Sequence, residues 1–110
     1  MRYTPERGDI VWLDFDPQSG HEQAGRRPAL VVSHSPYNKK VGLAIFCPIT
    51  NQEKGFPFEV KLPGGIKAKG VVLADQVKNL DWQKRNAEFY CKVPESVLDE
   101  VSAKIKTLIF

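Results

Sequence analysis

The residues best suited to chemistry lie in one polar stretch, Gly20 to Pro28, which combines an imidazole, a carboxylate, an amide and two guanidinium groups. A base, an acid and a fixed cation are what acid–base chemistry at a phosphodiester uses. The stretch belongs to a connection from Asp16 to Arg27, and a hairpin turns in far fewer residues. Since long loops in compact domains are commonly functional, this connection is a candidate active-site loop. A solvated surface loop is the alternative.

Short strands must position this loop. β-branched and aromatic residues predict a strand at Ile10–Phe15, and Pro28 precedes an apolar strand at Ala29–Ser33. Turn signals separate further strands, which are expected at 43–49, 56–62, 71–77 and 88–93. Residues 35–40 are predicted to be a turn with Lys39 and Lys40 at its tip, and a short irregular turn is expected from Asp81.

Only the C-terminal segment is predicted to be helical. Pro94 suits the first helical position because its missing N–H costs nothing there. Apolar residues recur at helical spacing and form one stripe, made of Val97, Leu98, Val101, Ile105, Leu108 and Ile109. The stripe is expected to pack on the core, with a dimer contact as the alternative. Six or seven short strands and one terminal helix predict a small, mostly antiparallel β-barrel.

Length and composition indicate a single domain over residues 1–110, with 42% hydrophobic and 26% charged residues. No apolar run approaches the roughly 20 residues of a membrane span, and the N-terminus has no apolar signal core. Cys47 and Cys91 lie in apolar or aromatic contexts without metal-ligand spacing, which predicts buried free thiols in a reducing cytoplasm. We therefore expect a soluble cytoplasmic protein that does not bind a membrane.

Positive charge is concentrated in the middle of the chain. Residues 25–92 hold twelve Lys/Arg against five Asp/Glu, whereas residues 1–24 hold two against five. This distribution suits a polyanionic partner, although a net charge of +3 is also compatible with an ordinary solvated surface.

Several catalytic classes have no counterpart in the sequence. It has no Gly-rich phosphate loop and no Gly-x-Ser-x-Gly elbow. His21 and His34 belong to no Cys/His cluster, and Asp14 and Asp16 lack the partners of a two-magnesium site. No metal or cofactor is predicted, so phosphodiester chemistry here is expected to be metal-independent. RNA allows this because its own 2′-OH can be the nucleophile.

Seven segments resemble, in this order, the MazF/PemK/Kid toxins of type II toxin–antitoxin modules: 8–12, 15–17, 20–25, 27–29, 48–50, 55–58 and 72–78. The resemblance implies an SH3-like barrel of MazF/CcdB type with a C-terminal helix, and a homodimer. It implies a ribosome- and metal-independent endoribonuclease that cuts single-stranded mRNA at short sequences, leaves 2′,3′-cyclic phosphate and 5′-OH ends, and inhibits translation and growth. It also implies a cognate MazE/PemI-like antitoxin whose disordered acidic tail covers the RNA site.

The resemblance implies four catalytic positions, which are Arg27, Thr50, Glu22 and His21. Arg27 would stabilise charge developing on the scissile phosphate, with an ion pair to Glu22 as its alternative role. Thr50 would donate to a phosphate oxygen, although a threonine ending a strand is usually a turn residue. The general base is left open among Glu22, His21 and Asp75. Kid has an arginine two residues before the last of these, where this chain has Leu73.

Further basic, amide and aromatic residues suit RNA binding. Cations can follow the phosphates, aromatic rings can stack on bases, and amides can read base edges. The candidates are Gln23, Arg26, Lys39, Lys40, Asn51, Gln52, Lys54, Phe56, Asp75, Gln76, Lys78 and Arg85. Trp82 is a further stacking candidate, with packing in the core as its alternative.

Two other function classes stay open on the sequence alone. One is a non-catalytic toxin of the same fold that binds a protein target, as CcdB binds gyrase. The other is a plain RNA-binding domain. Incubation with a long RNA in EDTA separates them, because only a nuclease yields fixed fragments.

Overall fold

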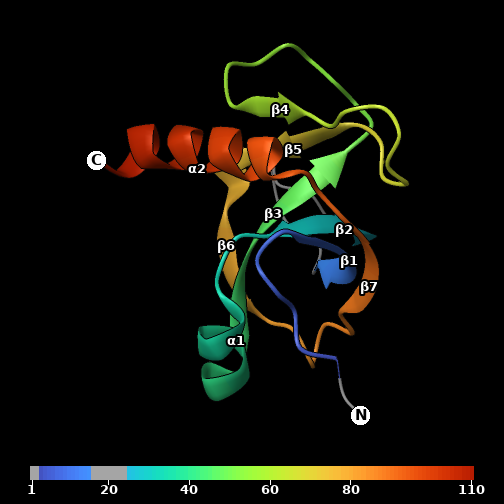
Figure 1. Ribbon diagram of the computed structural model, residues 1–110, viewed down its shortest axis with the longest axis vertical. Coiled ribbons are helices and arrows are strands. Elements are labelled where there is room, and N and C mark those ends of the chain that lie inside the picture. Colours follow the sequence, from blue (N-terminus) through green and yellow to red (C-terminus); the bar gives the residue numbers. More distant parts are fainter. Residues whose placement is uncertain (1–2, 16–24) are drawn as a thin grey trace.

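An antiparallel sheet carries most of the chain, in a computed structural model that describes residues 3–15 and 25–110 (Figure 1). The strands are β1 (Asp9–Phe15), β2 (Gly25–Val31), β3 (Leu43–Thr50), β4 (Glu59–Lys61), β5 (Val71–Leu73), β6 (Lys78–Asp81) and β7 (Glu88–Lys92). The helices are α1 (Ser35–Val41) and α2 (Glu95–Ile109), with a 3-10 turn at Ala74–Gln76. The expected β fold with a C-terminal helix is confirmed.

The sheet is open, although it curves like a barrel. Its strand order is β4-β5-β3-β2-β1-β7, and β6 pairs with β3 beside this path. Within the described residues no pairing joins β4 to β7. The eight-residue β3 links the parts, because it pairs with β2 and β6 along its length and with β5 at Ile49 and Thr50. The predicted barrel is therefore barrel-like without complete closure.

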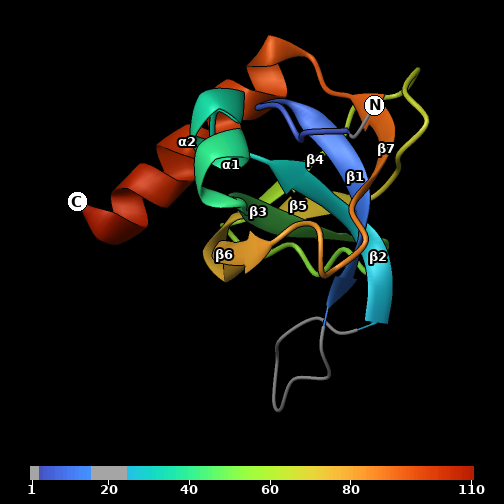
Figure 2. The same ribbon diagram turned by 90° about the horizontal axis from the view of Figure 1, so that it is seen from below.

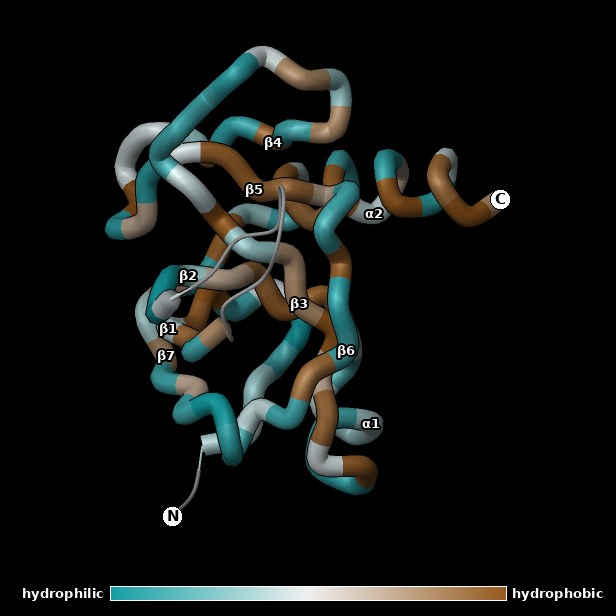
Figure 3. The backbone as a smooth tube through the Cα atoms, turned by 180° about the vertical axis from the view of Figure 1, so that it is seen from behind, coloured by the Kyte–Doolittle hydropathy of each residue, from teal (hydrophilic) through white to brown (hydrophobic). Residues whose placement is uncertain are grey.

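The sheet buries both of its faces, which explains why its strands are nearly continuous apolar runs. On one face Ile10, Leu30 and Cys47 pack with residues of α2. On the other face Val11 and Phe46 belong to a second cluster that includes Trp82. Figure 3 shows hydrophobic residues along β3 and β5 between the polar connections. The two clusters hold the strands rigidly enough to position polar residues at their ends.

The turn predicted at residues 35–40 is wrong, because these residues form α1. Pro36 sits in its first turn, and Gly42 ends the helix in the left-handed conformation with φ 79°. The fully buried Asn38 donates to the carbonyls of Pro5 (2.8 Å) and Ser33 (3.1 Å), so the helix is fixed by bonds to distant residues. Local turn signals alone did not reveal these bonds.

Two predicted strands are shorter than expected. The 56–62 segment is a strand only from Glu59, since Pro57 has no N–H to donate to a ladder. The 71–77 segment ends as a strand at Leu73, and a 3-10 turn leads into β6, which the sequence did not predict. Trp82 follows β6 and packs in the core, where its indole N–H donates to the Asn38 carbonyl at 3.0 Å. It is therefore not available to stack on a base.

The α2 stripe divides into a packed part and an exposed part. Val97, Leu98 and Val101 are buried, as expected for core packing, whereas Leu108 and Ile109 are exposed. This end of α2 points away from β1, β2 and β7 in two perpendicular views (Figures 1 and 2). No helix in the described residues is long and apolar enough to cross a membrane.

Both cysteines are free thiols, but only one is fully buried as predicted. Cys47 lies within the core, and burial raises the pKa of its thiol to about 12. Cys91 is half-buried at the end of β7. Neither is joined by a disulfide, so the fold is stabilised without a covalent cross-link between cysteines.

Candidate active site

Arg27 and Thr50 border one cavity of about 450 Å³, which lies where β2 begins and β3 ends. Ala29 lies opposite Pro48 in the register of these strands, so the positions two residues further along, Arg27 and Thr50, extend from the same face. Thr50 is 8% exposed, and its Oγ1 accepts a hydrogen bond from the Gln52 backbone N–H at 3.2 Å. The hydroxyl keeps its hydrogen for donation to a further acceptor.

Thr50 also borders a second cavity of about 430 Å³. This cavity gathers five of the residues predicted to bind RNA, namely Gln52, Lys54, Phe56, Asp75 and Gln76. The backbone N–H groups of Lys54 and Gly55 donate to the Glu59 carboxylate at 3.0–3.2 Å, which fixes the connection before β4. Phe56 is 59% exposed, so its ring is accessible to a ligand. We call the two spaces the Arg27 cavity and the Phe56 cavity.

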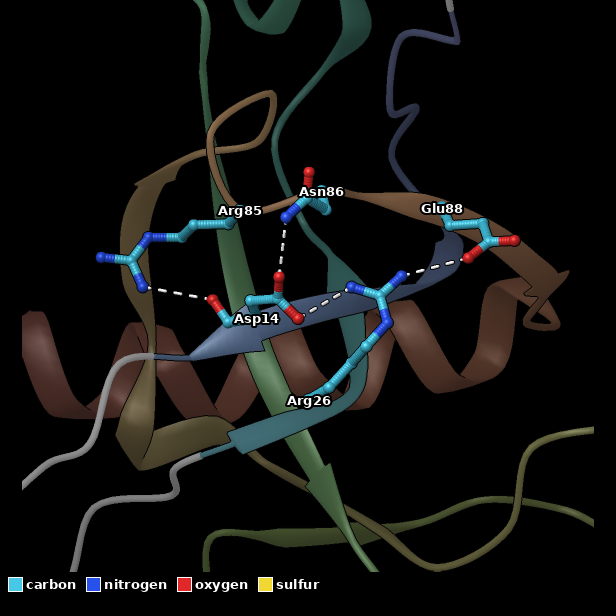
Figure 4. A network of polar contacts seen from close by, with 5 residues as sticks. All are labelled: Asp14, Arg26, Arg85, Asn86 and Glu88. Carbon is cyan, nitrogen blue, oxygen red and sulfur yellow. Dashed lines mark hydrogen bonds and ion pairs between the residues drawn. The ribbon is translucent and has the colours of Figure 1, made fainter.

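Consecutive arginines leave β2 in opposite directions. Arg26 lies opposite Asp14 and Arg27 opposite Leu13 in the β1–β2 register, and neighbouring side chains on a strand point to opposite faces. Figure 4 shows the result for Arg26, whose guanidinium bridges Asp14 at 2.9 Å and Glu88 at 3.1 Å. Two carboxylates therefore hold the Arg26 guanidinium in place.

Two residues of the β6–β7 connection complete this polar network (Figure 4). Asn86 donates to the Asp14 carboxylate at 2.8 Å, and Arg85 donates to the Asp14 carbonyl at 3.2 Å. The hydrogen bonds from Asn86 and Arg26 lower the pKa of Asp14, while Asp14 in turn raises the pKa of Arg26. The network joins β1, β2 and β7 where β1 ends and β2 begins, so it fixes the strand that carries Arg27.

The other predicted residues fall into three groups. Asn51 borders the Arg27 cavity together with Arg26. Lys39 and Lys40 lie on α1, at the opposite end of the molecule from β4 and β5 (Figure 1), and Lys78 lies by an apolar groove under α2. His21, Glu22 and Gln23 fall outside the described residues. The described part of the chain has no group of three His, Cys, Asp or Glu side chains arranged for a metal ion.

A family model described as "PemK-like, MazF-like toxin of type II toxin-antitoxin system" matches residues 6–109. The chain belongs to this family. The endoribonuclease toxin MazF of Escherichia coli is 49% identical over 108 residues, which cover 98% of this chain and 96% of that protein. The endoribonuclease PemK of Escherichia coli is 36% identical, with coverage of 94% and 81%.

Solved structures of family members agree with the fold. MazF from Deinococcus radiodurans aligns with a TM-score of 0.94 at 51% identity, over 98% of each chain. A MazE–MazF structure from the same organism aligns with a TM-score of 0.89 at 51% identity, over 98% of this chain and 97% of that one. The suspected membership in the MazF/PemK family is thus confirmed over nearly the whole chain.

Sequence reasoning missed a glycine that controls the position of Thr50. Gly70 has φ +109°, and a Cβ on it would lie 2.2 Å from the Thr50 carbonyl oxygen and 3.1 Å from Asn51 Oδ1. Real Cβ atoms do not approach backbone atoms so closely. Gly70 therefore lets β5 begin directly against the end of β3. The sequence signalled only a glycine at the start of an apolar run.

We expect Gly70→Ala to displace the Thr50 backbone and reduce RNA cleavage by about 10- to 100-fold per folded molecule, since misplacing a reacting group by about 1 Å costs up to 10²-fold. Gly65→Ala is the matched control, because Gly65 also has a positive φ (+90°) but open space around its Cβ position. It should show only the backbone strain, about 1–3 kcal/mol. Urea unfolding and single-turnover cleavage measure the two effects. Equal cleavage by both variants would contradict the positioning role.

Proposed function

We propose that this chain is the toxin of a type II toxin–antitoxin module and cleaves single-stranded RNA endonucleolytically at short sequences. The observation that carries the proposal is that Arg27 and Thr50 border one cavity, next to a second cavity lined by side chains that the sequence predicts to bind RNA. The relatives at 49% and 36% identity are named endoribonucleases. Their names support RNA cleavage as the function of this chain, in preference to the binding of a protein target. We take residues 1–110 as one toxin domain.

In the proposed reaction, the 2′-OH of one nucleotide attacks the adjacent phosphorus while a general base removes its proton. The 2′-O–P bond forms and the P–O5′ bond breaks, which leaves a 2′,3′-cyclic phosphate and a 5′-OH end once the leaving oxygen is protonated. Arg27 stabilises the negative charge that develops on the phosphate oxygens. Thr50 donates its hydroxyl hydrogen to one of them. The base is Glu22, His21 or Asp75, and no metal takes part.

The proposal includes a protein partner and a second copy of the chain. MazE–MazF structures from Deinococcus radiodurans support an antitoxin that binds this toxin, and we infer that its disordered acidic tail covers the RNA-binding cavities. We also propose a homodimer, because Leu108, Ile109 and Phe110 form an exposed apolar end on α2. The toxin would act in the cytoplasm, where mRNA is translated, and so inhibit growth.

Cleavage of one long RNA in EDTA tests this function. We expect fixed fragments whose 5′ ends map to one short sequence, because the 2′-OH nucleophile needs no metal. The Arg27→Ala protein, purified in parallel, controls for contaminating ribonuclease. A gel shift without cleavage would identify an RNA-binding domain instead, and cleavage that returns only with magnesium would contradict the metal-independent mechanism.

Arg27→Ala should lower the cleavage rate by about 10²–10³, which is the usual loss when one donor to a transition-state oxyanion is removed. RNA affinity should fall by at most about 1–2 kcal/mol, the scale of one charge-assisted hydrogen bond. Single-turnover kinetics and equilibrium binding separate the two effects. Arg7→Ala is the matched control, since Arg7 contacts Ser102 and Glu95 at α2 instead of either cavity. Loss of binding with an unchanged rate would make Arg27 a binding residue.

The pH–rate profile identifies the base. The acid limb of the profile should fall near pH 4.3 if the base is a free glutamate and near pH 6.5 if it is a free histidine, as rough reference values. We expect the acid limb to disappear in either Glu22→Gln or His21→Gln and to persist in Asp75→Asn, because the arginine that accompanies this aspartate in Kid is Leu73 here. An acid limb that disappears only in Asp75→Asn would reverse the assignment.

A further inference from the structure

One wall of the Arg27 cavity has no role in the proposed chemistry. Trp12 of β1 and Tyr90 of β7 form this wall, with ring centroids 5.0 Å apart and ring planes at 37°. Both side chains are half-buried, so each ring is supported by the sheet and partly open to solvent. Two rigid aromatic rings of this kind are a platform on which a nucleobase can stack.

Two lysines approach the same wall from the connection between β4 and β5. The Tyr90 hydroxyl donates to the Lys67 carbonyl at 3.0 Å and ties this connection to β7. Ala68 is 2% exposed and anchors the segment, while Lys67 and Lys69 on either side of it are exposed and line the cavity. The aromatic pair and the lysines are thus held together by a hydrogen bond and a buried residue.

The charges of this cavity favour an anion. Its lining contains no carboxylate side chain among the described residues, in contrast to the Phe56 cavity, which is lined by Glu59 and Asp75. Arg26 is held by Asp14 and Glu88. Within residues 3–15 and 25–110, neither Lys67 nor Lys69 has a carboxylate partner, and their charge is available to a ligand.

We propose that the Arg27 cavity is a nucleotide subsite, in which Trp12 stacks on a base of the RNA and Lys67 and Lys69 bind its phosphate. The inference rests on the proposed nuclease function and adds the path that the RNA takes across the protein. Trp12 lies opposite Pro28 in the β1–β2 register and so shares the face of Arg26, whereas Arg27 and Thr50 extend from the other face. Since Thr50 borders both cavities, the RNA passes around the end of β3 at Thr50, from the Phe56 cavity to the Trp12 wall, with the cleaved bond between them. An acidic peptide would use the lysines but has no base for the aromatic platform.

The lysines are tested with an oligoribonucleotide that contains the mapped cleavage sequence and carries a 2′-deoxy sugar at the cleavage site. Removing one lysine that neutralises a phosphate of single-stranded RNA should reduce the slope of log K against log [salt] by about 0.7. For Lys67→Ala/Lys69→Ala we expect a reduction of about 1.4 by the same relation, with the same fold stability. Lys84→Ala/Lys106→Ala is the matched control, because it removes two exposed lysines that border neither the Arg27 cavity nor the Phe56 cavity and should leave the slope unchanged.

Stacking is tested by replacing one base at a time with an abasic site. Wild-type protein should lose about 5- to 150-fold in affinity when the base that stacks on Trp12 is removed, the range for one base–aromatic stack. Trp12→Leu should show the same loss with intact RNA and no further loss at that one abasic position, whereas Trp12→Phe should behave like the wild type. Urea unfolding midpoints identify any variant that is not fully folded, and the lysine pair tests the subsite independently.

The outcomes separate the subsite from the nuclease function. If wild-type protein cleaves the long RNA but Lys67→Ala/Lys69→Ala behaves like the control pair Lys84→Ala/Lys106→Ala and no abasic position couples to Trp12, the subsite is refuted and the nuclease function stands. The subsite is also refuted, and the nuclease function stands, if Lys67→Ala/Lys69→Ala binds RNA like the wild type and weakens only the binding of a purified antitoxin. If wild-type protein cleaves no RNA, the proposed function itself fails.

Discussion

The structure depends on one strand that serves two parts of the sheet. β3 pairs with β2 on one side and β6 on the other, and its last two residues also pair with β5. Both faces of its central residues are buried, which fixes its position. Thr50 is the final residue of this strand and pairs with Val71 of β5. The Thr50 hydroxyl, which we propose to bind phosphate, thus belongs to a strand that pairs with β2, β5 and β6.

This arrangement explains why the candidate site is at the strand ends. A strand interior within two apolar clusters offers no space for a polyanion, and polar groups there would be unsatisfied. At the ends of β2 and β3 the clusters stop, and Arg27, Thr50 and Asn51 border a cavity. The absence of a side chain at Gly70 allows β5 to begin against Thr50, so the two cavities meet at this residue.

The neighbouring residues Arg26 and Arg27 extend from opposite faces of β2, and we assign them different roles. Arg26 fixes β1, β2 and β7 together through two carboxylates, and exposed pairs of this kind contribute little to stability individually. Their value lies in geometry, because they define where β2 starts and thereby where Arg27 leaves it. Arg27, one residue later, extends from the other face together with Thr50. The two-residue repeat of a strand thus places the ion-paired Arg26 and the proposed catalytic Arg27 on opposite faces of the sheet.

The sequence by itself determined the family, through segments that resemble it, and the strands near β1, β2, β3 and β7 and the helix α2, through local patterns. Apolar runs and helical spacing depend on nearby residues, so the sequence alone indicates these elements. Arg27 and Thr50 were chosen from the resemblance, and their catalytic roles stay predictions. Only the tertiary structure decided that residues 35–41 form α1, that β6 exists, and that Lys39 and Lys40 lie far from the candidate site. The tertiary structure also decided that Arg26 pairs with Asp14 and that Gly70 lies close against the Thr50 carbonyl. It brings Trp12 and Tyr90 to the same cavity as Lys67 and Lys69. Each of these depends on residues far apart in the chain that meet only when the sheet forms, so no local pattern encodes it.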